Sequence, residues 1–119
     1  GPYVQYAYAR INSIFEKGEV KKVSSHIDYS IYDDKEKQII KKLAEYSSII
    51  ESAMKNFKPS LLARYLLDLS QMFNEYYHSH QILKESEEVK DARILLLDSI
   101  RVVIKDGLNL LGIDVVERM

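Results

Sequence analysis

Cysteine is absent from the 119-residue sequence, which excludes disulfides, thiolate zinc sites and cysteine nucleophiles. Long apolar runs are also missing. The longest unbroken aliphatic run, Ile94–Leu97, is far shorter than the roughly 20 apolar residues that a membrane-spanning helix needs. The sequence does not open with a charged region followed by an apolar core, so we expect no signal peptide. These absences predict a cytoplasmic protein that binds no membrane.

An excess of charge of either sign is lacking too. The 17 Lys and Arg residues are balanced by 18 Asp and Glu residues, for a net charge of −1, whereas nucleic-acid-binding domains are usually basic. The charge is uneven, with eight basic and six acidic residues over 1–42 but nine and twelve over 43–119. A neutral domain gains little from attraction to phosphates. If it binds RNA, it should depend on base stacking and on a larger parent protein.

Glycine and proline are scarce, with four and two residues respectively, and tryptophan is absent. Apolar residues recur at spacings of three and four, and no stretch of period-two alternation competes with that pattern. The length fits one domain spanning residues 1–119. The sequence therefore predicts an all-α fold, an up-and-down bundle of four or five helices.

The expected helices cover about residues 3–17, 34–46, 49–57, 59–78 and 86–111. Gly18 and Gly112 are expected to end the first and last of them, and Asp33 or Asp34 to cap the second. The second and third segments either form one helix or are divided near residues 46–48. Gly107 interrupts the last helix, which indicates either a bend or a close neighbour.

The helical spacing also predicts the core, and the 59–78 segment has the strongest period. Tyr65 and Phe73 are expected at its centre, and Tyr8 is expected to anchor the first helix. The remaining residues predicted to face inward are Val4, Ala7, Ile11, Ile14, Phe15, Ile39, Ile40, Leu43, Ile49, Ile50, Ala53, Met54, Phe57, Leu62, Leu66, Leu69, Met72, Tyr76, Tyr77, Val89, Ala92, Leu96, Ile100, Val103 and Ile104.

Few residues combine into a pattern that could carry chemistry. His78 and His80 are two apart, whereas helical metal ligands are usually three or four apart, so this pair predicts a solvated helix end. The acidic residues of 87–91 suit a helix N-terminus. No glycine-rich loop could cradle a phosphate. We therefore expect no catalytic residue, metal site or cofactor within this chain.

One cluster of functional interest remains, in residues 3–10 (YVQYAYAR). It places three tyrosines, an amide and a guanidinium within about two helical turns. Such a surface can stack bases and bond their edges, at about 1–3 kcal/mol per stacked base. The other interpretation is a tyrosine-rich amphipathic helix that seals a core. Tyr6 and Arg10 are four residues apart and lie toward the side of the apolar face.

Residues 3–11 resemble the segment that opens the anticodon-binding domain of arginyl-tRNA synthetases. Further segments of this family follow in the same order, and the chain ends on Glu117-Arg118-Met119, which resembles the C-terminus of the family. The resemblance covers nearly the whole chain, although residues 19–56 match least and the family's Asp-Ala-Leu-Arg string reads Asp91-Ala92-Arg93-Ile94 here. The further segments are residues 62–69 (LARYLLDL), 73–77 (FNEYY), 91–93 (DAR) and 107–113 (GLNLLGI).

The resemblance implies the C-terminal fragment of a class I synthetase that attaches arginine to its tRNA. The catalytic domain, which uses ATP and Mg²⁺, would precede residue 1, so the fragment itself should not catalyse aminoacylation or bind a cofactor. Its expected partners are the anticodon loop of arginine tRNA and its own catalytic domain, and we expect a monomer.

The resemblance also implies which residues approach the central anticodon base. By position, Tyr6 and Tyr77 would bracket the base, Arg10 would contact its edge or a phosphate, and Met119 would close the pocket. Tyr76 is the alternative to Tyr77, because the two rings point about 100° apart on a helix. The implied site consists of Gln5, Tyr6, Arg10, Tyr76, Tyr77 and Met119.

Two other functions fit the sequence less well. A stand-alone helical module for protein interaction would show a contiguous exposed apolar patch and no pocket of aromatic rings and arginine. The RNA-binding domain of another synthetase would show only a weak preference for arginine tRNA.

Overall fold

The computed structural model describes residues 2–117, which form five α-helices and one 3-10 turn and contain no strand. The all-α fold predicted from the sequence is confirmed. The elements in chain order are α1 (Pro2–Lys17), η1 (Tyr29–Ile31), α2 (Asp34–Ala44), α3 (Tyr46–Lys55), α4 (Pro59–Ser79) and α5 (Glu87–Leu110).

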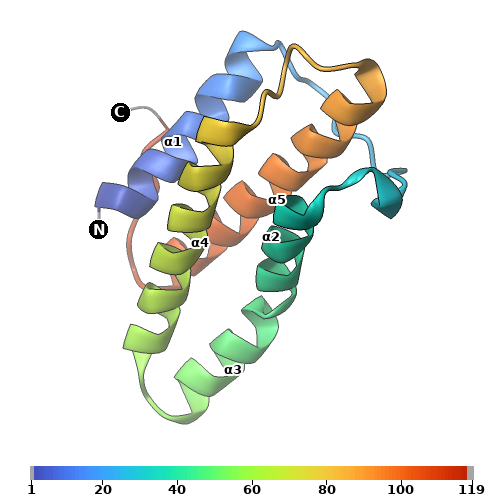
Figure 1. Ribbon diagram of the computed structural model, residues 1–119. Helices are drawn as coiled ribbons and strands as arrows, with labels where there is room; N and C mark the ends of the chain where they lie inside the picture. The colour runs from blue at the N-terminus through green and yellow to red at the C-terminus, as the bar shows by residue number, and fades with distance from the viewer. Residues whose placement is uncertain (1, 118–119) are drawn as a thin grey trace.

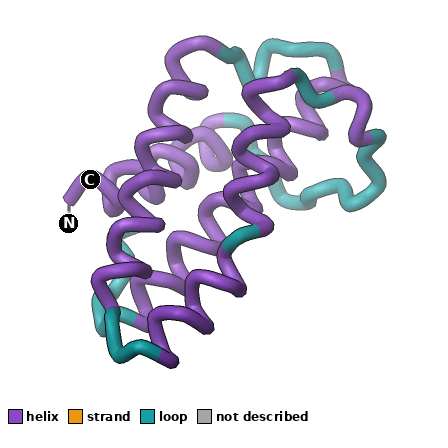
Figure 2. Tube along the Cα trace, turned by 60° about the horizontal axis from the view of Figure 1, so that its bottom comes forward, coloured by secondary structure: helices purple, strands orange, loops and turns teal. Residues whose placement is uncertain are grey.

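Helix α4 is the centre of the bundle and contacts each of the other four helices. Figure 1 shows that α1 and α4 run in the same direction, whereas α2, α3 and α5 run in the opposite direction. Most loops lie near the ends of these helices, whereas the break between α2 and α3 lies partway along the bundle (Figure 2). The C-terminal half of α4 therefore lies beside α1, and its N-terminal half pairs with α3.

Helix α2 begins with a capping box. The Asp33 side chain accepts a hydrogen bond from the backbone N–H of Glu36, and Glu36 Oε1 accepts one from the backbone N–H of Asp33 at 2.9 Å. This satisfies two backbone donors that a helix start otherwise leaves without partners. Of the two expected caps, Asp33 is the one used.

Helices α2 and α3 are separate and divide at Glu45, whose backbone N–H bonds to the Lys42 carbonyl in a tightened last turn. The Tyr65 hydroxyl also donates to the Lys42 carbonyl, at 2.6 Å. The Lys42 carbonyl, in the last turn of α2, therefore accepts from both a backbone N–H and a side chain of α4.

Gly112 and Gly107 have different roles in α5. Gly112 has φ +77° and ends α5 in a Schellman motif, with Ile113 N–H bonded to the Leu108 carbonyl at 2.8 Å. At the end of α1, where Gly18 was expected to take this role, the left-handed residue is instead Glu19, with φ 50°. Gly107 is needed for close packing, because a Cβ there would lie 2.8 Å from the Leu66 methyl carbons.

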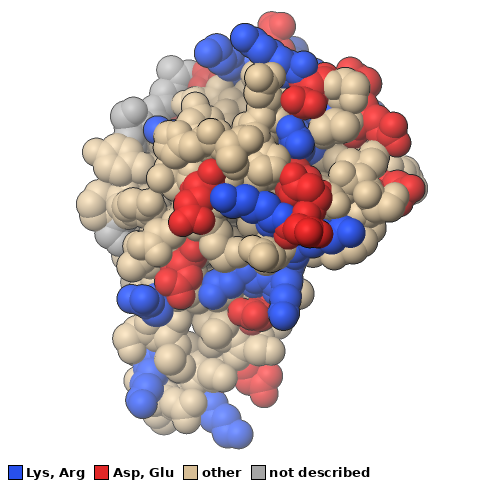
Figure 3. All heavy atoms as spheres, in the orientation of Figure 1, with Lys and Arg blue, Asp and Glu red and all other residues tan. Residues whose placement is uncertain are grey.

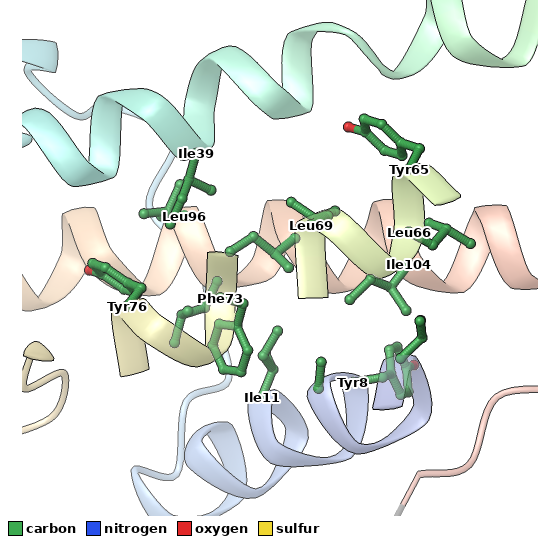
Figure 4. Packing of buried hydrophobic residues seen from close by; sticks show 14 of the residues in the cluster. Tyr8, Ile11, Ile39, Tyr65, Leu66, Leu69, Phe73, Tyr76, Leu96 and Ile104 are labelled. Atoms are coloured by element: carbon green, nitrogen blue, oxygen red, sulfur yellow. The ribbon is translucent and has the colours of Figure 1, made fainter. Parts of the chain in front are cut away.

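The core lies between α4 and the helices on either side of it. Tyr65 and Phe73 are buried as predicted, and Figure 4 shows them with Leu69 between α1 and the helices α2 and α5. Residues of α5 outside the predicted set, among them Leu97 and Leu108, are also buried. They were missed because α5 contacts three helices, so its buried face is wider than a single stripe.

The prediction that Met54 and Phe57 face inward is wrong. Met54 is 71% exposed and Phe57 is 90% exposed. Helix α3 ends at Lys55, and Phe57 takes φ 52° in the turn to α4. The helical period therefore stops before Phe57, and the far end of the bundle has no further helix to cover either side chain.

Candidate nucleic-acid interface

A groove of about 900 Å³ runs between α1 and the C-terminal half of α4. The connection from α4 to α5 borders its far end. Arg10, Lys17 and Lys84 are the charged residues among its lining, which contains no Asp or Glu. The lining consists of Tyr3, Tyr6, Ala7, Ala9, Arg10, Ser13, Ile14, Lys17, Ser70, Phe73, Asn74, Tyr77, His78, His80, Gln81, Ile82, Leu83 and Lys84.

Arg10 is held in place by two residues of α4. Its guanidinium carbon lies 4.5 Å from the centroid of the Tyr77 ring, in a cation–π arrangement. Its Nη1 donates a hydrogen bond to Asn74 Oδ1 at 3.0 Å. These contacts orient the planar guanidinium across the groove, and its other N–H groups remain available to a ligand.

Tyr6 lies one helical turn before Arg10 on α1 and is 58% exposed. Tyr3, which is 42% exposed, lines the groove together with Tyr6. Tyr8, in contrast, is buried against the core as predicted. The exposed tyrosines therefore offer flat faces on which bases could stack.

The neighbouring tyrosines of α4 point to different sides. Tyr76 has no exposed surface, its hydroxyl donates to Glu36 Oε2 at 2.5 Å, and its ring stacks on His80. Burial, together with the bond to Glu36, raises the pKa of Tyr76 above its ordinary value. Tyr77 is half-buried and lines the groove. The structure thus brings Tyr77, and not Tyr76, to Arg10.

Gln5 contacts the C-terminal segment and does not line the groove. Its Nε2 donates to the Asp114 carbonyl at 2.8 Å, and its Oε1 accepts from the Val116 N–H at 2.9 Å. Asn12, further along α1, donates to Glu117 Oε2 at 2.8 Å. The amide of Gln5 therefore ties the chain end to α1. Met119 lies outside the described residues.

His80 is not the solvated helix end that its spacing from His78 predicted. Its Nε2 lies 2.6 Å from Asp33 Oδ2, and its Nδ1 lies 2.7 Å from the Ser79 hydroxyl. Partial burial opposes ionisation of Asp33, but the bonds from Glu36 N–H and His80 outweigh it and lower the pKa of the carboxyl. Within residues 2–117, no three His, Asp or Glu side chains group as a metal site.

A buried ionic cluster behind α4 was not foreseen from the sequence. Glu36 is almost fully buried and accepts from Arg93 Nε at 3.0 Å as well as from Tyr76. Arg93 Nη1 donates to the Gln81 carbonyl at 2.7 Å. The cluster therefore joins α2, α4 and α5 to the connection that borders the groove.

Three groove residues were also missed. Asn74 is three residues before Tyr77 on α4, and Lys17 is seven residues after Arg10 on α1, so helical spacing alone could have placed each on the groove side. Lys84 lies in a connection, where no period exists, so the sequence carries no comparable signal for it.

Residues 4–119 match the family model of the DALR anticodon binding domain. The chain belongs to this family. It is 46% identical over its whole length to an arginine–tRNA ligase of Clostridium botulinum, and 44% identical to one of Streptococcus pneumoniae. It covers 21% of each of these relatives, and so spans about a fifth of their length.

A solved structure gives the same relationship for this DALR-family domain. The Thermus thermophilus arginyl-tRNA synthetase superposes on the whole chain with a TM-score of 0.89 at 32% identity, over 21% of its own length. No helix within the described residues is long and apolar enough to cross a membrane. The resemblance of residues 3–11 to arginyl-tRNA synthetases is thus confirmed over the entire chain.

Proposed function

We propose that this domain binds arginine tRNA through its anticodon loop, and that the groove between α1 and α4 is the binding surface. The observation that carries the proposal is the Arg10 guanidinium stacked on Tyr77 in a groove without carboxylates, in a member of an anticodon-binding family. Tyr6 completes the surface with an exposed ring one turn away.

Tyr6 and Arg10 would have different functions in binding the base. The ring of Tyr6 can stack on an unpaired base at about 1–3 kcal/mol, whatever the base is. Selection among bases requires hydrogen bonds to their edges, and the N–H groups of Arg10 that do not bond Asn74 can supply them. Asn74 and Tyr77 orient the guanidinium before any base binds. Little side-chain conformational entropy is therefore lost on binding.

The domain would act as one part of a longer enzyme. We propose that residues 1–119 form a single domain that holds arginine tRNA while the catalytic domain of the longer enzyme, with ATP and Mg²⁺, joins arginine to it. The chain covers about a fifth of each relative, which fits such a division. We further propose a monomer that works in the cytoplasm.

The test is a fluorescence titration of two labelled RNAs. One is the anticodon stem-loop of arginine tRNA, and the other is the same stem-loop with its central anticodon base replaced. Tighter binding of the first RNA would support anticodon reading. Equal affinities would reduce the domain to a general RNA binder, and no binding at high protein concentration would exclude the groove as an RNA site.

A further inference from the structure

We infer that the groove binds more than the read base: Lys17 and Lys84, at its far end, contact phosphates of the adjoining single strand. This inference rests on the proposed function and extends it from base reading to backbone binding. Lys17 lies two helical turns beyond Arg10 on α1, roughly 10 Å along the helix axis. That separation suits a strand that continues past the base held at Arg10.

The connection after α4 packs directly against the end of α1. A Cβ on Gly18 would lie 2.5 Å from Leu83 Cδ2, so the connection could not sit where it does if residue 18 carried a side chain. Lys17 and Lys84 are the chain neighbours of these two residues. The glycine contact therefore holds the two lysines at the same end of the groove.

Both lysines are exposed and free to bind an anion. Neither forms an ion pair with a carboxylate in residues 2–117. Two other lysines do pair with carboxylates: Lys42 with Glu45 and Asp68, and Lys35 with Glu75 at 4.0 Å. The ammonium groups of Lys17 and Lys84 can therefore bind a phosphate without first breaking an ion pair.

The groove lining is more positively charged than the chain as a whole. The sequence holds 18 Asp and Glu residues, yet the groove lining includes none, while three cations lie along it. Figure 3 shows Lys and Arg atoms, with Asp and Glu atoms beside them, at the end of the molecule where α1 terminates in Figure 1. A groove with aromatic rings at one end and unpaired lysines at the other matches the chemistry of single-stranded nucleic acid, which combines stackable bases with phosphates.

The experiment measures how RNA affinity depends on salt. The double variant Lys17→Gln/Lys84→Gln removes both charges and keeps similar side-chain length. The matched control, Lys41→Gln/Lys105→Gln, removes two exposed lysines that do not line the groove. Each protein is titrated with the anticodon stem-loop of arginine tRNA, and with the stem-loop whose central base is replaced, at several salt concentrations.

Each phosphate contact on a single strand contributes about 0.7 to the slope of log affinity against log salt concentration. The groove variant should therefore lose about 1.4 from the slope, and the control variant should lose little. Both stem-loops should weaken by the same factor, because phosphate contacts carry no sequence information. The ratio between their affinities should stay as it is in the unmodified protein.

Two outcomes would overturn the inference in distinguishable ways. If the unmodified domain discriminates between the stem-loops but the groove variant keeps its full salt slope, the lysines bind no phosphate and the proposed function survives. If the unmodified domain binds neither RNA, the proposed function and the inference fail together. A thermal melt of each variant checks that it is folded.

Discussion

At the scale of single residues, Tyr76 and Tyr77 show how one step along a helix separates structure from function. Tyr76 points away from the groove into the buried cluster around Glu36, whereas Tyr77 supports Arg10 at the surface. The two side chains are chemically identical. Their different roles come only from the turn of about 100° between successive positions of a helix. Substitutions at the two positions should therefore affect different properties.

Tyr76→Phe should lower the free energy of unfolding and leave RNA affinity unchanged. The variant keeps the ring but removes the hydroxyl that donates to the buried Glu36 carboxylate. Losing a buried hydrogen bond to a charged group costs about 1–3 kcal/mol. Denaturant unfolding measures the first effect and stem-loop titration the second. Unchanged stability would show that Arg93 and the Asp33 N–H satisfy Glu36 without Tyr76.

At the scale of elements, the ends of the helices carry more strain than their middles. Glu19 and Phe57 have positive φ angles, where an L residue with a side chain is disfavoured. Each occupies the position after a helix end that glycine usually fills. At Phe57 the exposed ring gains almost no burial in return.

Phe57→Gly should therefore raise the free energy of unfolding, by up to about 1 kcal/mol. Relief of the left-handed conformation stabilises the folded state, and the greater freedom of glycine in the unfolded chain offsets part of the gain. Denaturant unfolding of the variant and the unmodified protein gives the difference. A clear loss of stability would mean that the exposed ring makes a contact the folded domain needs.

The sequence predicted the elements better than the joints between them. Periodicity placed the helices and the buried faces of Tyr65 and Phe73, and the family resemblance singled out Tyr6 and Arg10. Beside the division of α2 from α3, the Tyr65 hydroxyl of α4 reaches the Lys42 carbonyl, a contact that only the folded packing creates. Lys84 likewise reaches the groove only because Leu83 packs on Gly18. Local pattern carries no information on such long-range contacts.

At the scale of the whole molecule, tyrosine hydroxyls connect segments that are far apart in the sequence. Tyr32 donates to the Ala92 carbonyl at 2.7 Å, and Tyr65 donates to the Lys42 carbonyl at 2.6 Å. Burial, with a smaller effect of Glu36, raises the pKa of Tyr32 to about 12. Burial, with a smaller effect of Glu45, raises the pKa of Tyr65 to about 12. The folded state therefore binds these protons more tightly than the unfolded chain does.

This linkage predicts that the domain loses stability at alkaline pH. The contribution of the two tyrosines is complete below their ordinary pKa of 10.0 and declines as the pH rises from there toward about 12. Denaturant unfolding at a series of pH values measures the decline. Tyr32→Phe removes one of the protons, so its stability should fall less steeply over that window. An equal slope in the variant would contradict the raised pKa of Tyr32.

Arg10, held in place by Tyr77, is the side chain that we propose reads the central anticodon base. The direct test compares Arg10→Ala with Arg64→Ala, which removes an exposed arginine of α4 outside the groove lining. For each variant, titration gives the ratio of affinities for the anticodon stem-loop of arginine tRNA and its central-base replacement. We predict that Arg10→Ala brings this ratio close to one and that Arg64→Ala leaves it unchanged. An unchanged ratio in Arg10→Ala would contradict this role of Arg10.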